Sequence, residues 1–193
     1  MTKKHGSEGF TLIEMALVLV LGGLMLGTVL KGQMMVESFK MQRLVRDLQS
    51  MSYAFHTYFT MYNALPGDDA NNHGWASVSG GNNDGRIDGN DVKDGNEVHE
   101  AWQALRRAGL IIGNPDATDK KALPGSPYGG HYSLGYRNFS SHMGSRNCIL
   151  ATNINSSIAE SVDIRHDDGI YNSGSISASD AYTSERVDLC YSL

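Results

Sequence analysis

One carboxylate lies inside the most apolar stretch of the chain. Glu14 is the fifth residue of a 21-residue block, 10–30, in which 15 residues are apolar. An ionised carboxylate costs roughly 2.5 to 3.5 kcal/mol in a membrane helix, so it needs a cationic partner unless it reaches the interface or takes up a proton. The block contains no cation. The functional interpretation places that partner on another molecule, and the alternative is an interfacial carboxylate without a partner.

A second group of polar side chains lies in the glycine-rich stretch 80–91, which resembles the calcium loop of EF-hand and dockerin modules. Aligning Gly85 with the obligatory glycine of that loop places five residues at ligand positions. The expected ligands are Asn82, Asp84, the Arg86 carbonyl, Asp88 and Asp91. The match is incomplete because Gly80 holds the first ligand position, so Asp68 or Asp94 would have to complete the set. The loop is therefore a weak calcium site or an unliganded cluster of turns.

The remaining chemistry-bearing residues do not form an enzyme motif. His99-Glu100-Ala101-Trp102-Gln103 resembles half of the zinc-protease motif, but Gln103 stands where the second histidine must be, so we expect a core helix. The sequence has no G-x-S-x-G, no P-loop and no paired-cysteine metal motif, which argues against an enzyme. With 16 basic and 21 acidic residues and no basic cluster, we expect no nucleic-acid partner.

The apolar block has the properties of a retained membrane helix. At 1.5 Å per residue it reaches about 31 Å, enough for a hydrocarbon core of about 30 Å. Lys3, Lys4 and His5 precede it, so the positive-inside rule predicts a cytoplasmic amino terminus and an exported head. No small-residue cleavage site follows Leu30, so we expect the block to be retained. In an exported head the only cysteines, Cys148 and Cys190, most simply form one disulfide, and the alternative is two buried thiols.

The start of the apolar block carries a specific motif. Gly9-Phe10-Thr11-Leu12-Ile13-Glu14, followed by an apolar run, resembles the processing and assembly signature of type IV prepilins and of the pseudopilins of type II secretion. The resemblance is strongest over about 9–33. Leu65-Pro66-Gly67-Asp68-Asp69 and Asp167-Asp168-Gly169 also look like a subgroup of proteobacterial prepilins.

The resemblance implies a function and a cellular location. A membrane peptidase would cut after Gly9 and methylate the new amine of Phe10, and that amine would pair with Glu14 of a neighbouring subunit. The partners would be copies of this chain in a helical filament, together with the peptidase, the assembly machinery and the inner membrane of a Gram-negative bacterium. We expect an extracellular pilus, or alternatively a periplasmic pseudopilus or a minor pilin acting as a membrane-anchored, calcium-dependent binding module. Cys148 and Cys190 resemble the late disulfide of pilins.

One long helix should organise the amino-terminal third. No proline occurs between 10 and 65, and apolar residues recur at steps of 3 and 4 in a stripe typical of a buried helix face. The stripe contains Met34, Met41, Leu44, Leu48, Met51, Phe55, Tyr58 and Tyr62. A coiled-coil seam is the alternative. Gly22, Gly23 and Gly27 favour close helix packing or local melting, although membrane helices generally carry more glycine.

The sequence predicts an α+β, type IV pilin-like fold in which the long helix packs on a small antiparallel sheet with a long glycine-rich loop. The expected layout is a leader at 1–9, a membrane or filament-core helix at 10–30, its amphipathic continuation at 31–65 and a globular head at 66–193. Within the head we expect a helix at 96–108, strands at 128–136, 147–152 and 187–191, and a helical turn at 156–165.

Overall fold

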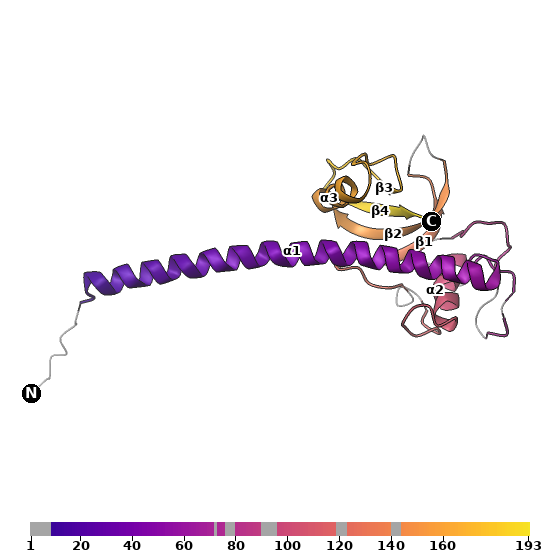
Figure 1. Cartoon of the computed structure of the whole chain (residues 1–193), viewed down its shortest axis with the longest axis horizontal. Helices are drawn as coiled ribbons and strands as arrows, with labels where there is room; N and C mark the ends of the chain where they lie inside the picture. Colours follow the sequence, from indigo (N-terminus) through magenta and orange to yellow (C-terminus); the bar gives the residue numbers. More distant parts are fainter. Residues whose placement is uncertain (1–8, 72, 76–79, 90–95, 119–122, 140–143) are drawn as a thin grey trace, which may run out of the picture. The chain divides into compact units, whose positions relative to one another are not determined.

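The computed structural model describes residues 9–71, 73–75, 80–89, 96–118, 123–139 and 144–193. The chain is α+β, with the elements in the order α1, α2, β1, β2, α3, β3, β4 (Figure 1). It divides into two units, one ending at Phe39 and the other running from Lys40 to Leu193, which we call the head. The helix α1 belongs to both units, so its two halves are described separately.

The helix α1, Leu12–Tyr62, is continuous, as the sequence predicts. It ends where Asn63 adopts a left-handed φ of 53° and donates its N–H to the Phe59 carbonyl at 2.8 Å. A left-handed residue at this position is a common helix terminator, and Pro66 then prevents the helix from resuming. The glycines at 22, 23 and 27 do not interrupt the helix.

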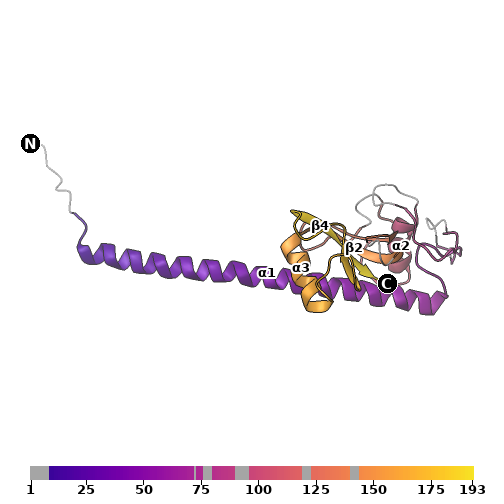
Figure 2. The same cartoon turned by 90° about the horizontal axis from the view of Figure 1, so that it is seen from above.

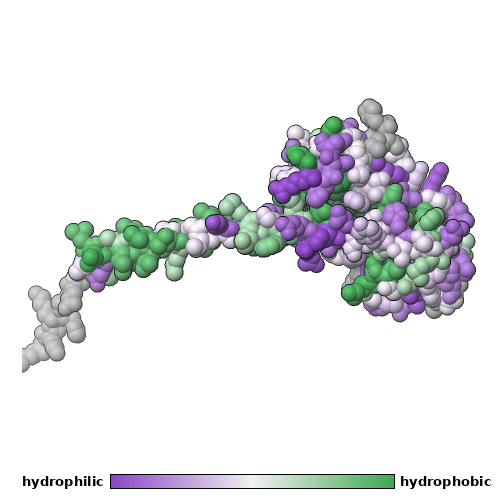
Figure 3. Space-filling model, viewed as in Figure 1, coloured by the Kyte–Doolittle hydropathy of each residue, from purple (hydrophilic) through white to green (hydrophobic). Residues whose placement is uncertain are grey.

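The amino-terminal half of α1 has an apolar surface without a core of its own. Its large apolar side chains from Leu12 to Val36 are exposed, and Figure 3 shows this half as a largely hydrophobic surface. Among the residues that the structure describes, nothing lies within 4 Å of the position that a Cβ would occupy on Gly22, Gly23 or Gly27. By length and composition, this part of α1 could cross a membrane.

The carboxyl-terminal half of α1 contributes the predicted stripe to the core of the head. The stripe residues Met41, Leu44, Leu48, Phe55 and Tyr58 are buried, whereas Met51 and Tyr62 are partly buried. The head itself covers these residues, so they are not the free seam that a coiled coil requires. The prediction that the stripe residues are buried was wrong for Met34. This side chain is 66% exposed because it precedes the head.

The head contains one antiparallel sheet with the strand order β1-β2-β4-β3. Its strands are β1 (Tyr132–Arg137), β2 (Arg146–Asn155), β3 (Ile176–Ala178) and β4 (Arg186–Ser192). The register between β2 and β4 shifts between Ala151 and Ile154, where Asn153 has a left-handed φ of 61°. The sequence predicts β1, β2 and β4 but not β3, because three residues are too few to show an alternating pattern.

Two helices complete the head. In α2, Glu97–Arg107, the Asn96 side chain caps the first turn by accepting from the His99 N–H, and Trp102 is fully buried. In α3, Ser156–His166, the Asn155 side chain plays the same capping role. The predicted helical turn at 156–165 is thus a complete helix, which packs on β2, β3 and β4.

The core lies between α1, α2 and the sheet. Figure 1 shows the strands above the second half of α1 and α2 below it, and Figure 2 shows the same elements from above. Buried side chains from all of these elements form one cluster. A hydrogen bond also joins the layers, because the Tyr132 hydroxyl donates to Asp47 of α1 at 3.0 Å.

Candidate functional site

The predicted assembly carboxylate caps the first turn of α1. The backbone N–H and the hydroxyl of Thr11 each donate to Glu14 Oε2 at 2.8 Å, and the Glu14 N–H donates to Thr11 Oγ1 at 3.3 Å. These reciprocal bonds form a capping box. Phe10, the residue expected to carry the new amine, directly precedes this cap and is 84% exposed, and Gly9 is exposed too. The rest of the predicted leader, residues 1–8, lies outside the described residues.

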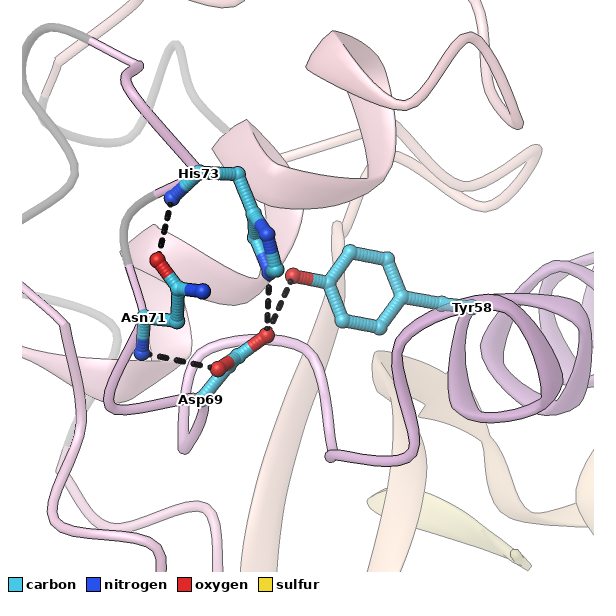
Figure 4. Close-up of polar contacts among 4 residues, drawn as sticks. All are labelled: Tyr58, Asp69, Asn71 and His73. Carbon is cyan, nitrogen blue, oxygen red and sulfur yellow. Dashed lines mark hydrogen bonds and ion pairs between the residues drawn. The ribbon is translucent and has the colours of Figure 1, made fainter.

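The chain leaves α1 through a turn held by the carboxylate of Asp69. Figure 4 shows that Asp69 Oδ2 accepts from the Tyr58 hydroxyl at 3.2 Å and lies 2.7 Å from His73 Nε2. Its other oxygen accepts the Asn71 N–H at 2.8 Å. Burial and the neighbouring Asp69 raise the pKa of Tyr58, which therefore remains a hydrogen-bond donor. This network fixes the end of α1 to the following loop.

The adjacent carboxylate, Asp68, holds the predicted calcium loop. It is buried, and its two oxygens accept the N–H groups of Asp84 at 3.0 Å and Gly85 at 2.8 Å. Gly81 leaves room for this contact, because a Cβ there would lie 2.3 Å from Asp68 Cα. We expected Asp68 to be a possible additional metal ligand, but the structure uses both of its oxygens to bind the loop backbone.

The loop closes against the sheet through the side chain of Asn147. This side chain donates to the Gly85 carbonyl at 2.9 Å and accepts the Ile87 N–H at 3.0 Å. Ile87 is fully buried, and its carbonyl accepts the Tyr136 N–H at 2.8 Å. The described part of the loop is therefore fixed to the core by the protein itself.

The predicted calcium ligands are only partly brought together. Asn82 and Asp88 line a shallow hollow of about 460 Å³ beside the amino terminus of α2, whereas Asp84 and Arg86 do not line it. The side-chain oxygens of Asn82 and Asp84 accept the N–H groups of Asp84 and Arg86, each at 2.9 Å. The fifth predicted ligand, Asp91, lies outside the described residues.

Two glutamates that the sequence does not assign to this site also line the hollow. We call this hollow the acidic hollow. The two glutamates are Glu97 and Glu100, both from α2. The Glu97 carboxylate accepts the Asp88 N–H at 2.7 Å and the Asn82 N–H at 3.4 Å. Burial, together with the nearby Asp68 and Asp88, raises the pKa of Glu97 above its usual value. The sequence does contain a signal for these two glutamates, because they lie in the first turn of a predicted helix that follows an acidic loop.

The half-motif of zinc proteases on α2 belongs to the packed interior of the head. His99, Glu100 and Gln103 are all buried along the inner part of the helix. Glu100 reaches the acidic hollow, and the Gln103 side chain donates to the Ala117 carbonyl at 3.3 Å. This arrangement agrees with the predicted core helix.

The two cysteines lie together between β2 and β4. Cys148 pairs with Ser192 and Cys190 pairs with Leu150, so the cysteines are diagonal neighbours on one face of the sheet. Both are buried free cysteines in the structure, and a hydrogen bond joins their side chains. This bond and burial raise the pKa of Cys148. The disulfide itself stays a prediction.

A second acidic cluster follows α3. Asp163, Asp167 and Asp168 place carboxylate oxygens within 4.8 Å of one another, a spacing that one cation could bridge. Asp163 is buried, accepts from the Tyr182 hydroxyl at 2.6 Å and has its pKa raised by burial. Asp167 accepts the Ile176 N–H at 2.8 Å. These bonds fix the segment between α3 and β3, which contains the Asp167-Asp168-Gly169 motif.

The chain matches no family model, no curated protein sequence and no solved structure.

Proposed function

We propose that the chain is the structural subunit of a type IV pilus or of a pilus-like filament. The observation that carries the proposal is the exposed apolar half of α1, which continues without a break into a head with its own core. An apolar surface of this length requires lipid or similar helices around it. The same surface would hold the precursor in the inner membrane and pack against other copies in a filament.

In this proposal the prepilin peptidase cuts between Gly9 and Phe10 and methylates the amine of Phe10. The capping contacts of Glu14 are compatible with the assignment, because they come from Thr11, which carries no charge, and so leave the negative charge available to a cation. An ammonium group from a neighbouring subunit would approach an oriented carboxylate. A charge pair of this kind favours assembly over diffusion in lipid with an unpaired charge.

A calcium-dependent binding role for the head is the second candidate, and the acidic hollow favours it. Asn82, Asp88 and Glu97 offer the hard oxygen ligands that calcium prefers. The two roles are compatible, because a minor pilin can belong to a filament and bind a partner through its head. Both are binding or structural roles, and we propose no enzymatic activity.

Electron microscopy and mass spectrometry of sheared surface material test the proposal. We expect filaments that contain the chain, with an amino-terminal peptide that begins at methylated Phe10. A major subunit would dominate the filament mass, and a minor pilin would be substoichiometric. A periplasmic pseudopilus would instead be found by fractionating the periplasm of secreting cells. A processed chain that enters no filament in either compartment would contradict the proposal.

A further inference from the structure

A second hollow in the head lies between α1 and the segment that follows α2. Its volume is about 500 Å³, which is in the range of ligand-binding sites in proteins. It shares no lining residue with the acidic hollow, so the two are separate surfaces. We call it the α1 groove, and its lining includes Arg43, Asp47, the segment 110–112, Pro124 and Gly125.

One wall of the α1 groove is apolar and held in place by the core. Leu110 and Ile111 pack against the core, and the Leu110 N–H donates to the Leu105 carbonyl at 3.0 Å. Ile112, the next residue, is fully exposed. An apolar side chain that bound against this wall would remove the surface of Ile112 from water without any rearrangement of the backbone.

Another wall of the α1 groove contains an open backbone edge. An isolated bridge pairs Gly125 with His131, and the neighbouring residues make its hydrogen bonds, such as the Tyr132 N–H to the Pro124 carbonyl at 2.7 Å. Hydrogen bonds alternate along an antiparallel pair, so the N–H and C=O of Gly125 point away from this partner strand. Neither group has a hydrogen bond to another described residue. An extended chain can therefore pair with this edge.

The α1 wall of the groove carries a charge pair that is neutral as a whole. Asp47 Oδ2 accepts from the Tyr132 hydroxyl at 3.0 Å and lies 3.6 Å from Arg43 Nε. Burial and the nearby Asp47 raise the pKa of Tyr132, so its hydroxyl stays a donor and orients the carboxylate. Asp47 Oδ1 accepts no hydrogen bond from the described residues, and the Arg43 side chain is 64% exposed. This wall therefore offers one acceptor and several donors without a net charge.

These three walls together specify the chemistry of a ligand. A peptide group has one N–H donor and one C=O acceptor, and both the Gly125 edge and the Arg43–Asp47 pair offer the matching groups. A charged ligand gains little here, because the charges of the groove are already paired. The apolar wall adds a place for one large apolar side chain.

We propose that the α1 groove binds an extended, uncharged peptide segment of another protein, with a large apolar side chain against Ile112. The segment would add to the open edge at Gly125 by main-chain hydrogen bonds, which is a common mode of peptide recognition. This binding is independent of filament assembly and of calcium. It gives the head a peptide partner in addition to the proposed structural role.

Peptide binding to the full chain in lipid nanodiscs tests the proposal. The probe is a fluorescent, capped peptide of sequence Thr-Val-Leu-Val-Thr, followed by anisotropy, with empty nanodiscs as the background for lipid binding. We expect saturable binding of this peptide. Replacement of its leucine by aspartate, or N-methylation of all of its amides, should weaken binding about tenfold or more. The first change places a charge against an apolar wall, and the second removes the donors for the open edge.

Two variants of the chain test the place of binding. Ile112→Asp should weaken binding of the leucine peptide about tenfold or more, and it removes no core contact because Ile112 is fully exposed. Ile164→Asp is the matched control, since Ile164 is 62% exposed on α3 and does not line the groove. Binding by Ile164→Asp should equal that of the unsubstituted chain. Equal binding by Ile112→Asp and the unsubstituted chain would overturn the proposal.

The remaining outcomes separate this site from the other proposals. Absence of saturable binding, or equal binding of the three peptides, would overturn the groove and leave the filament function intact. Binding should persist in chelator, and its loss there would assign it to the acidic hollow instead. If nanodiscs bind the peptide but sheared filaments do not, a neighbouring copy covers the groove, and the proposal of an outside partner fails.

Discussion

At the scale of single residues, the structure gives Glu14 a role that is independent of assembly. Its carboxylate caps the first turn of α1 through Thr11, so a substitution removes a cap and a charge together. Loss of an N-terminal cap typically costs about 0.5 to 2 kcal/mol of helix stability. The two roles can be separated because Thr11 contributes to the cap and carries no charge.

We therefore predict different effects for Glu14→Ala and Thr11→Ala. Glu14→Ala should insert into the membrane and be processed but give few filaments, because it lacks the carboxylate that pairs with the amine of a neighbour. Thr11→Ala weakens the cap but keeps the carboxylate, so most of the filament yield should remain. Filament yield and the amount of processed chain in membranes are the two measurements. Normal assembly of Glu14→Ala would reject the charge-pair role.

The acidic hollow should make the stability of the head depend on pH. The pKa of Glu97 is raised above its ordinary value of 4.5, first by burial, so the folded chain keeps this proton to a higher pH than the unfolded chain. The contribution of Glu97 to the unfolding free energy is thus complete at low pH and declines as pH rises through the raised pKa. The slope cannot exceed about 1.4 kcal/mol per pH unit, because one proton is involved.

Denaturant unfolding of the calcium-free head at several pH values measures this effect. The variant Glu97→Gln should lack the part of the decline that Glu97 causes, because its amide does not ionise. Glu185→Gln is a suitable control, since Glu185 lies outside the lining of the hollow. Identical pH profiles for Glu97→Gln and the unsubstituted head would contradict the assignment.

At the scale of elements, the sequence predicts those parts that have strong local signals. The period of α1, the Asn96 cap of α2 and the presence of β1 each follow from one segment and agree with the structure. The alternation predicted for β1 was wrong, because Ser133 and Gly135 on its other face are buried as well. The strand β3 and the contribution of Glu97 to the acidic hollow depend on contacts between distant segments. The role of Asp68 could not be predicted from the sequence for the same reason. Its carboxylate binds the backbone N–H groups at 84–85, and this contact exists only in the folded loop.

The neighbouring positions of Cys148 and Cys190 on β2 and β4 lead to a prediction about covalent linkage. We expect one disulfide between them in the exported protein, closing a loop that contributes about 4 kcal/mol in the chain-entropy model. Both thiols are buried in the folded head, out of reach of an external oxidant, so the bond should form during folding rather than afterwards. Non-reducing peptide mapping measures the linkage.

The effect of a reductant gives the control for this bond. The melting temperature of the exported head should fall under strongly reducing conditions. A Cys148→Ala/Cys190→Ala variant should melt at the same temperature with and without the reductant. Two free thiols in protein isolated from the cell surface would reject the disulfide.

The loop between α1 and α2 gives a prediction about calcium. The backbone is already held by Asp68 and Asn147, so calcium should tighten the acidic hollow rather than fold the loop from a disordered state. An incomplete ligand set favours a dissociation constant of about 10⁻⁵ to 10⁻³ M. A hundredfold excess of calcium over that constant would stabilise the head by roughly 2.7 kcal/mol.

Thermal melts of a fragment that starts at Lys31 and contains the whole head, in millimolar calcium and in chelator, measure this increment. Asp88→Asn and Glu97→Gln should reduce it, because both side chains line the hollow. Asp84→Ala should also reduce it if the loop binds in the EF-hand manner, and have little effect if the hollow alone binds the ion. Superimposable melts of the unsubstituted head would show that the loop is an ordinary cluster of turns.

At the scale of the whole molecule, the two parts of the chain have different requirements. The head buries its apolar residues in its own core, whereas the amino-terminal half of α1 leaves them exposed. The head can therefore fold without a partner, but this half of α1 needs lipid or other helices around it. Processing at Gly9-Phe10 would leave this apolar helix attached to the head and remove only residues 1–9, which precede it.

The last prediction concerns the mature chain. Cleavage after Gly9 removes Lys3, Lys4 and Glu8, so the formal net charge changes from −5 to −6 before the termini are counted. Intact-mass analysis of the membrane fraction should give a chain that starts at methylated Phe10, and inactivation of the prepilin peptidase should leave the longer chain. Both forms should remain in the membrane, because both keep the apolar half of α1. A mature chain that retains Met1, or one cut after Leu30, would contradict the prediction, and the second would also release the head from the membrane.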